Sequence, residues 1–176
     1  MNYEEFIADL DKRLEGYFVA HKEFIHCKLG CSMCCEKGDY PLSKIELEYL
    51  MQGFINLDNE IKIKVQNNIK NIVRGGACPF LINKQCSVYP YRPIICRVHG
   101  LAYICKESTD GTGTDMKHTT IPSVVKVPYC VNNGKNYADV YGDGEITINP
   151  VLENLDTQNL LKDFEYGEIR NLTDWI

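Results

Sequence analysis

Crowded cysteines are the feature of this 176-residue sequence that most constrains its fold. Four of its nine cysteines fall within nine residues, in the run Cys27-Lys-Leu-Gly-Cys31-Ser-Met-Cys34-Cys35. Three more follow further along the chain, at Cys78, Cys86 and Cys96. A hydrophobic core has no packing reason to crowd thiols in this way, whereas soft metals bind deprotonated thiolates. The sequence therefore predicts a metal ion or a metal–sulfur cluster that organises the fold.

Structural disulfides are the alternative explanation for so many cysteines. Nine is an odd number, so complete pairing within one chain is impossible. The N-terminus has neither the basic region nor the apolar run of a signal peptide, and no apolar stretch approaches the roughly 20 residues that span a bilayer. We therefore expect a cytoplasmic protein without a membrane segment, in a compartment that keeps thiols reduced. A net charge of −5 gives no electrostatic footprint for nucleic acid.

Apolar periodicity predicts several helices. Residues 2–25 carry apolar side chains at three-to-four spacing, namely Tyr3, Phe6, Ile7, Leu10, Leu14, Tyr17 and Phe18. A second helix is predicted to begin near Ser43, because Ser43 and Glu46 have capping-box spacing. A third is predicted after Asp58, with Arg74 in its last turn and a stop at Gly75. A C-terminal helix is predicted over 151–161.

The remaining segments predict loops and short strands. Residues 27–42 are expected to form an irregular loop that presents thiols, and 106–120 a long flexible loop with almost no apolar side chains. A short hairpin is predicted around Asn83, a short helix from Pro93, and a short strand over 145–148, while 121–130 has an apolar and β-branched pattern that leads to Cys130. The predicted fold class is mainly α with short β hairpins. Residues 1–176 would form a small single domain organised around a cysteine-ligated metal centre.

Cysteine spacing bears on the type of metal. Structural zinc prefers paired two-cysteine knuckles, but only Cys31 and Cys34 form one here. A compact four-cysteine run with remote further cysteines is more typical of an iron–sulfur cluster, so the spacing favours 4Fe-4S and leaves zinc as the alternative. The spacing of Cys27, Cys31 and Cys34 also matches radical S-adenosylmethionine enzymes. Those enzymes place it after the first strand of a β/α barrel, whereas a helix is predicted before it here.

The combined string C-x3-C-x2-C-C followed by C-P-F-L, C-x-V-Y-x-x-R-P and C-R resembles the cysteine-cluster family of zinc- or iron-chelating proteins (CxxCxxCC type). The resemblance covers 27–100, the motif core, and a later cysteine. It implies the ligand set Cys27, Cys31, Cys34, Cys35, Cys78, Cys86, Cys96 and Cys130. A flagellin lysine methylase has a similar cysteine arrangement, so cluster-dependent methyl transfer is a further alternative.

Cationic and aromatic residues near the second cysteine segment complete the predicted site. We expect Arg92, Arg97 and His99 to lie beside the metal group, where they would stabilise its negative charge. Tyr89 and Tyr91 would shield it, and Cys105 is interpreted as a core residue outside the motif. The predicted function is an iron–sulfur protein with a redox or cluster-dependent catalytic role, acting on a redox partner or a protein substrate. A zinc-binding interaction module without catalysis is the alternative.

Overall fold

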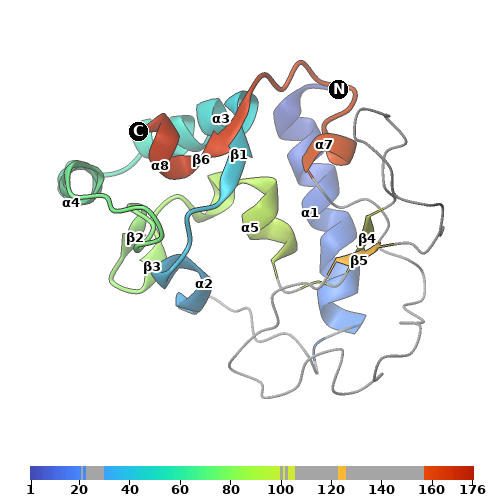
Figure 1. Ribbon diagram of the computed structural model, residues 1–176, viewed down its shortest axis with the longest axis horizontal. Helices are drawn as coiled ribbons and strands as arrows, with labels where there is room; N and C mark the ends of the chain where they lie inside the picture. The colour runs from blue at the N-terminus through green and yellow to red at the C-terminus, as the bar shows by residue number, and fades with distance from the viewer. Residues whose placement is uncertain (21, 23–29, 100, 102, 106–122, 126–156) are drawn as a thin grey trace, which may run out of the picture.

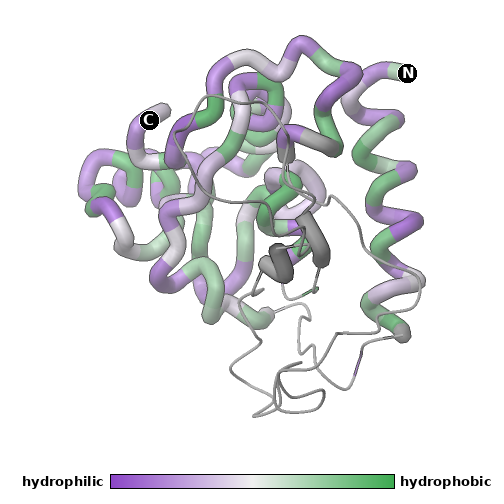
Figure 2. The backbone as a smooth tube through the Cα atoms, turned by 45° about the vertical axis from the view of Figure 1, so that its right-hand side comes forward, coloured by the Kyte–Doolittle hydropathy of each residue, from purple (hydrophilic) through white to green (hydrophobic). Residues whose placement is uncertain are grey.

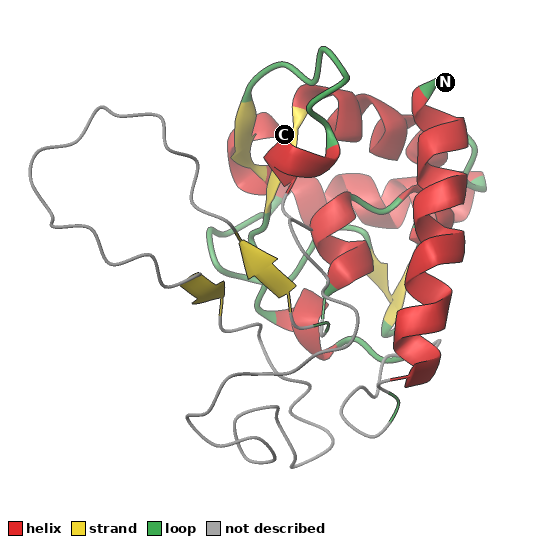
Figure 3. Ribbon diagram, turned by 90° about the vertical axis from the view of Figure 1, so that its right-hand side faces the viewer, coloured by secondary structure: helices red, strands yellow, loops and turns green. Residues whose placement is uncertain are grey.

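The computed structural model describes residues 1–20, 22, 30–99, 101, 103–105, 123–125 and 157–176 (Figure 1). Helices dominate the regular structure of these residues, and the strands are short and antiparallel (Figure 3). The predicted fold class, mainly α with short β hairpins, is confirmed. No helix in the described part of the chain is both long enough and apolar enough to cross a membrane.

Helix α1 (Tyr3–Ala20) begins with a reciprocal cap. The Asn2 side-chain oxygen accepts the backbone N–H of Glu5 at 2.8 Å, and the Glu5 carboxylate accepts the backbone N–H of Asn2 at 2.9 Å. These bonds satisfy N–H groups that the first turn leaves without intrahelical partners. The helix predicted over 2–25 is therefore confirmed as far as Ala20, and residues 21 and 23–25 lie outside the described part.

The predicted apolar face of α1 forms one of two groups of buried side chains. It packs against helix α5 (Ile94–Val98), which Figure 1 shows in the middle of the molecule with α1 on one side. This group consists of Phe6, Ile7, Leu10, Leu14, Ile94, Val98, Leu101 and Leu161. Figure 2 shows the corresponding alternation of apolar and polar residues along α1. Burial of this face anchors α5, which carries Cys96.

Helix α3 (Lys44–Ile55) begins at the predicted capping box, which is confirmed. The Glu46 carboxylate accepts the backbone N–H and the hydroxyl of Ser43, each at 2.7 Å. At Gly53, an added Cβ would lie 2.6 Å from the ring of Tyr91. The missing side chain therefore lets α3 pack directly on the 3-10 helix η1 (Tyr89–Tyr91).

Helix α4 (Asn59–Lys70) follows Asp58 as predicted but ends early. The prediction that Arg74 lies in its last turn is wrong, because Asn71 ends the helix. The Asn71 side-chain amide donates to the backbone carbonyl of Asn67 at 2.7 Å. Gly75 then takes a φ of 73°, which a glycine adopts without steric cost.

Strands β2 (Leu81–Ile82) and β3 (Gln85–Cys86) form the predicted hairpin. Asn83 and Lys84 turn it with φ angles of 50° and 63°, the positive values of a two-residue type I′ turn. The predicted short helix after Pro93 is confirmed as α5. Strand β4 (Tyr103–Cys105) pairs with β5 (Ser123–Val125), which lies within the apolar and β-branched segment 121–130. The loop predicted over 106–120 and the strand predicted over 145–148 lie outside the described residues.

The prediction of an irregular loop over 27–42 is wrong in two places. Helix α2 (Met33–Glu36) lies within it, and strand β1 (Pro41–Ser43) ends it. Strand β1 exists because it pairs with β6 (Ile169–Asn171), a partner near the C-terminus that no local pattern reveals. Of the helix predicted over 151–161, the described part is α7 (Thr157–Leu160).

The C-terminal helix α8 (Leu172–Trp175) completes the second group of buried side chains. This group joins β1, α3, α4, the hairpin and α8, and consists of Leu42, Leu50, Val65, Phe80, Val88 and Leu172. Polar contacts fasten the C-terminus further. The Thr173 hydroxyl donates to Asp39 at 2.6 Å, and Arg74 lies 3.1 Å from the Asp174 carboxylate. Cys78 and Cys86 pack against this second group, whereas Cys96 lies on α5 between Ile94 and Val98 of the first group.

Candidate metal centre

The first cysteine segment is shaped by the single turn of α2. The carbonyl of Ser32 accepts the backbone N–H of Cys35 at 2.8 Å and that of Glu36 at 3.0 Å. The Ser32 hydroxyl donates to the Glu36 carboxylate at 2.7 Å. This turn brings the Sγ atoms of Cys34 and Cys35 to 3.9 Å from each other, although adjacent residues on a helix usually diverge.

The second cysteine segment supplies thiols from three different local structures. Cys78 precedes the hairpin, Cys86 lies in strand β3, and Cys96 lies in helix α5. The backbone N–H of Cys78 donates to the carbonyl of Cys35 at 2.7 Å. This bond joins the two segments directly, so the protein backbone itself brings the thiols of both together.

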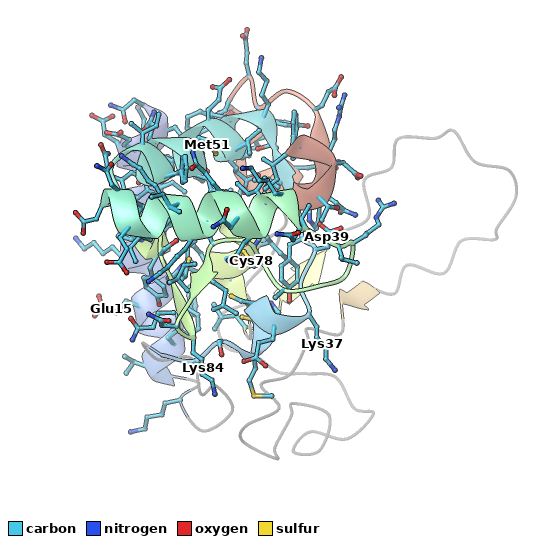
Figure 4. The ribbon with its side chains drawn as sticks, turned by 90° about the vertical axis from the view of Figure 1, so that its left-hand side faces the viewer. Glu15, Lys37, Asp39, Met51, Cys78 and Lys84 are labelled. Atoms are coloured by element: carbon cyan, nitrogen blue, oxygen red, sulfur yellow. The ribbon has the colours of Figure 1, made fainter. Side chains whose placement is uncertain are left out.

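Six cysteines surround one cavity of about 200 Å³: Cys31, Cys34, Cys35, Cys78, Cys86 and Cys96. Cys34, Cys35, Cys78, Cys86 and Cys96 are free thiols, so none of these five belongs to the disulfide framework considered from the sequence. Apolar side chains complete the walls, among them Leu42, Leu50, Phe80, Val88 and Leu172. Figure 4 shows Cys78 toward the middle of the molecule, whereas Lys37 and Lys84 point outward at the periphery.

Two predicted ligands, Cys27 and Cys130, lie outside the described residues. The same is true of the side chain of Cys105, whose backbone belongs to β4. The structure therefore brings together six of the eight predicted ligands, from segments that are far apart in the sequence.

Burial opposes ionisation of most of these thiols. It raises the pKa of Cys78 to about 11, and it also raises the pKa of Cys86 and Cys96. Neighbouring thiols add to the effect, since each additional thiolate would repel the others. The cavity on its own therefore favours neutral thiols, and a metal cation that supplies positive charge would favour thiolates.

Cys34 is the exception among the buried thiols. Its hydrogen bond with Cys35 lowers the pKa of Cys34 to about 7, and the same bond, together with burial, raises the pKa of Cys35. Either sulfur can be the donor of this bond, and ionisation of Cys34 would leave the Cys35 thiol to donate it. A sulfur donor set with one thiolate already favoured fits a soft metal.

The sulfur donors are spread around the cavity. Among the described residues, no three Cys, His, Asp or Glu side chains converge closely enough to hold a single ion. The six thiols instead line the walls of a shared cavity. This arrangement fits a group of several atoms whose ligands approach from different sides.

The three residues predicted to flank the metal group all line the cavity, but they differ in their contacts. The guanidinium of Arg97 is buried, and it donates to the Asp11 carboxylate and to the carbonyls of Pro90 and Arg92. Burial lowers the pKa of His99 and favours a neutral imidazole, whose ring centroid lies 5.6 Å from that of Tyr40.

Of these three residues, Arg92 best matches the role that was predicted for it beside the metal group. Its Cζ atom sits 3.7 Å from the ring centroid of Tyr89. Its Nε atom is buried and has no hydrogen-bond partner among the described residues. Tyr89 lines the cavity as a shielding residue would, whereas Tyr91 packs on Gly53 and is absent from the lining.

Sequence reasoning missed two residues that shape the first segment. The Tyr40 hydroxyl donates to the carbonyl of Cys34 at 2.9 Å. Gly38 is required beside it, because a Cβ there would overlap the Tyr40 ring and lie 2.5 Å from the Cys34 carbonyl oxygen. The Gly38-x-Tyr40 spacing carries no motif, so only the folded structure identifies this pair.

Comparison with known proteins bears on the cysteine pattern. A family model named CxxCxxCC, described as a putative zinc- or iron-chelating domain, matches residues 26–121, more than half of the chain. Neither the curated proteins nor the solved structures include a match. The matched range contains all six thiols of the cavity.

Proposed function

This chain belongs to the CxxCxxCC family of zinc- or iron-chelating domains, and we propose that the metal group it holds is an iron–sulfur cluster with a redox role. The family description covers metal binding and leaves the identity of the metal open. The proposal goes further and rests on the arrangement of the thiols.

The single observation that carries the proposal is the size of the cavity relative to its donors. One water molecule needs roughly 10–15 Å³ of such space. The cavity of about 200 Å³ is more than ten times larger, and six thiols line it. One tetrahedral zinc ion takes four protein ligands and needs no such volume. A cluster of iron and sulfide atoms uses both the space and thiols from several directions.

The described cysteines would supply the ligands, and a cubane cluster requires four of them. We propose the pair Cys34 and Cys35, with Cys78 and Cys96, as the central candidates, because the backbone bond between Cys35 and Cys78 holds both segments against the cavity. Cys27, Cys31, Cys86 and Cys130 remain predicted ligands. Bound in this cavity, an iron–sulfur cluster would supply one-electron transfer.

Protein residues would control access to this chemistry. Apolar walls would lower the polarity around a bound cluster, which bears on the potential of a redox group. Exposed apolar side chains lie close to the thiols at Met33 and Tyr89, both 43% exposed. We propose a redox partner or a protein substrate as the second participant, in the reducing environment of the cytoplasm.

Zinc is the second candidate, because one distance favours it. Two thiolates on a tetrahedral zinc ion, each at about 2.3 Å, lie about 3.8 Å from each other. The Sγ atoms of Cys34 and Cys35 lie 3.9 Å apart, close to that value. Zinc bound there would stabilise the fold without adding redox chemistry.

Metal analysis of protein purified without oxygen separates the two candidates. We expect iron and acid-labile sulfide in equal amounts, a broad visible absorption, and its bleaching by dithionite. Replacement of Cys34 by serine should remove the absorption and lower thermal stability, whereas Cys105→Ser, outside the motif, should leave the absorption unchanged.

Other outcomes would contradict the proposal. A colourless protein with one zinc ion and no sulfide would establish the zinc alternative. A folded protein that contains neither iron nor zinc after anaerobic preparation would overturn metal binding in this cavity altogether.

A further inference from the structure

Arg92 is held rigidly at the wall of the thiol cavity. The carbonyl of Arg92 accepts the Nε–H of Arg97 at 2.8 Å, and Arg97 also binds the carbonyl of Pro90. The neighbouring side chain of Tyr89 lies under the Arg92 guanidinium, with 3.7 Å between Cζ and the ring centroid. Backbone and side chain of Arg92 are therefore both fixed before any metal group binds.

The Nε–H of Arg92 is a hydrogen-bond donor in this wall for which the described residues provide no acceptor. Its nitrogen is buried, yet no described residue accepts a hydrogen bond from it. A buried donor without a partner destabilises a protein, so an acceptor is expected in the functional state. The residue lines the cavity, which is where such an acceptor would lie.

Arg92 shares the cavity wall with thiols from both cysteine segments. Cys34 and Cys35 of the first segment and Cys86 and Cys96 of the second line the same cavity. The Arg92 guanidinium is therefore a positive charge beside the sulfur atoms that would bind a metal group.

Arg97 differs in this respect although the sequence suggested the same role for both. Its three nitrogens already donate to Asp11, Pro90 and Arg92. Arg97 therefore braces the turn, and the donor left over at the cavity belongs to Arg92.

We propose that Arg92 is a positioning residue that donates its Nε–H to a sulfur atom of the bound cluster and thereby raises the reduction potential of that cluster. One-electron reduction by dithionite adds one negative charge to the cluster. A fixed cation and a hydrogen-bond donor stabilise the more negative form more strongly, so their removal makes reduction less favourable. This inference rests on the proposed iron–sulfur function.

The test compares the midpoint potentials of three anaerobically prepared variants with that of the wild-type protein. Arg92→Met removes both charge and donor, Arg92→Lys keeps the charge but removes the planar Nε–H, and Arg13→Met removes an exposed arginine on α1. For Arg92→Met we expect a tenfold loss in the one-electron equilibrium constant, a shift of about 59 mV to more negative potential. Arg92→Lys should recover part of this shift, and Arg13→Met should show none.

A second measurement reports the contact itself. Protein labelled with ¹⁵N at arginine Nε should show a nitrogen hyperfine coupling in the pulsed EPR spectrum of the reduced cluster. That coupling should disappear in Arg92→Lys and persist in Arg13→Met.

Three outcomes would count against the inference, and they can be told apart from failure of the proposed function. An unchanged potential in Arg92→Met, with normal iron and sulfide content, overturns the role of Arg92 alone. Full recovery of the potential in Arg92→Lys, without the nitrogen coupling in the wild-type protein, overturns donation by Nε–H. A wild-type protein without iron and sulfide overturns both the proposed function and this inference.

Discussion

The carboxylate of Glu46 accepts the backbone N–H of Ile94 at 2.9 Å, across 48 positions of sequence. Glu46 therefore caps two helices, because it also accepts the N–H and hydroxyl of Ser43 at the start of α3. Ile94 begins α5, the helix that carries Cys96. The buried side chain of Glu46 thus connects α3 to α5, which contributes Cys96 to the wall of the thiol cavity.

Replacement of Glu46 by alanine should lower the free energy of unfolding by about 3 kcal/mol, because buried hydrogen bonds to its carboxyl group are lost at two helix ends. Urea unfolding of the anaerobic protein measures this. Glu48→Ala, on the exposed side of the same helix, should change stability by less than about 0.5 kcal/mol. Equal effects of the two substitutions would show that the double cap is unimportant.

The contribution of Glu46 should depend on pH in a defined direction. Burial raises the pKa of Glu46 above its ordinary value of 4.5. Because the folded-state pKa exceeds the unfolded one, folding favours the protonated carboxyl. The stability of the wild-type protein relative to Glu46→Gln should therefore be greatest below pH 4.5 and decline as pH rises through the folded-state pKa. Unfolding curves of both proteins at a series of pH values check the sign, and an advantage that grows with pH would refute it.

Arg97 and its partner Asp11 should respond unequally to substitution. Arg97→Met leaves two carbonyls without their donor and should cost about 3 kcal/mol of unfolding free energy. Asp11→Asn should cost at most about 1 kcal/mol, since that side chain is 46% exposed while Arg97 is 1% exposed. Thermal unfolding with matched metal content measures both. A larger loss for Asp11→Asn would mean that the ion pair, and not the bracing of the Pro90–Arg92 turn, matters most.

Two glycine substitutions should act in opposite directions. Gly38→Ala would force Tyr40 and the Cys34 carbonyl apart and should destabilise the protein by about 1–3 kcal/mol while lowering its metal content. Gly16→Ala, in α1 with no atom within 4 Å of the new Cβ, should stabilise it by about 0.5–1 kcal/mol. Thermal unfolding and iron and zinc analysis test the pair. Normal metal content in Gly38→Ala would show that the Tyr40 contact is not needed for the site.

Alkylation of the reduced, metal-free protein should begin at Cys34. The hydrogen bond with Cys35 lowers the pKa of Cys34 to about 7, so about half of this thiol is ionised at neutral pH and the thiolate is the reacting form. Cys78 and Cys96, whose pKa burial raises, should react later than Cys34. Iodoacetamide labelling followed by peptide mass spectrometry gives the order. Cys35→Ala removes the hydrogen bond and should slow the reaction of Cys34, and bound metal should protect all of the cavity thiols.

Local sequence patterns predicted much of the helical structure correctly. The start of α3 at Ser43, the apolar face of α1 and the Asn83 turn depend on contacts within a few residues, which a sequence displays directly. The end of α4 was placed too late, because Asn71 competes with the apolar periodicity by capping the helix. The same limit applies to Tyr40, whose partner is a backbone carbonyl that no side-chain pattern reveals.

By itself, the sequence determined that this protein concentrates thiols, that helices deliver them, and that its family chelates zinc or iron. Only the tertiary structure decided which groups meet. The pairing of β1 with β6, the bond from Cys78 to the Cys35 carbonyl, and the contact between Arg97 and Asp11 all join residues distant in the chain. Such contacts form when burial and hydrogen bonding repay the entropy of closing long loops, and the balance is settled by the whole fold.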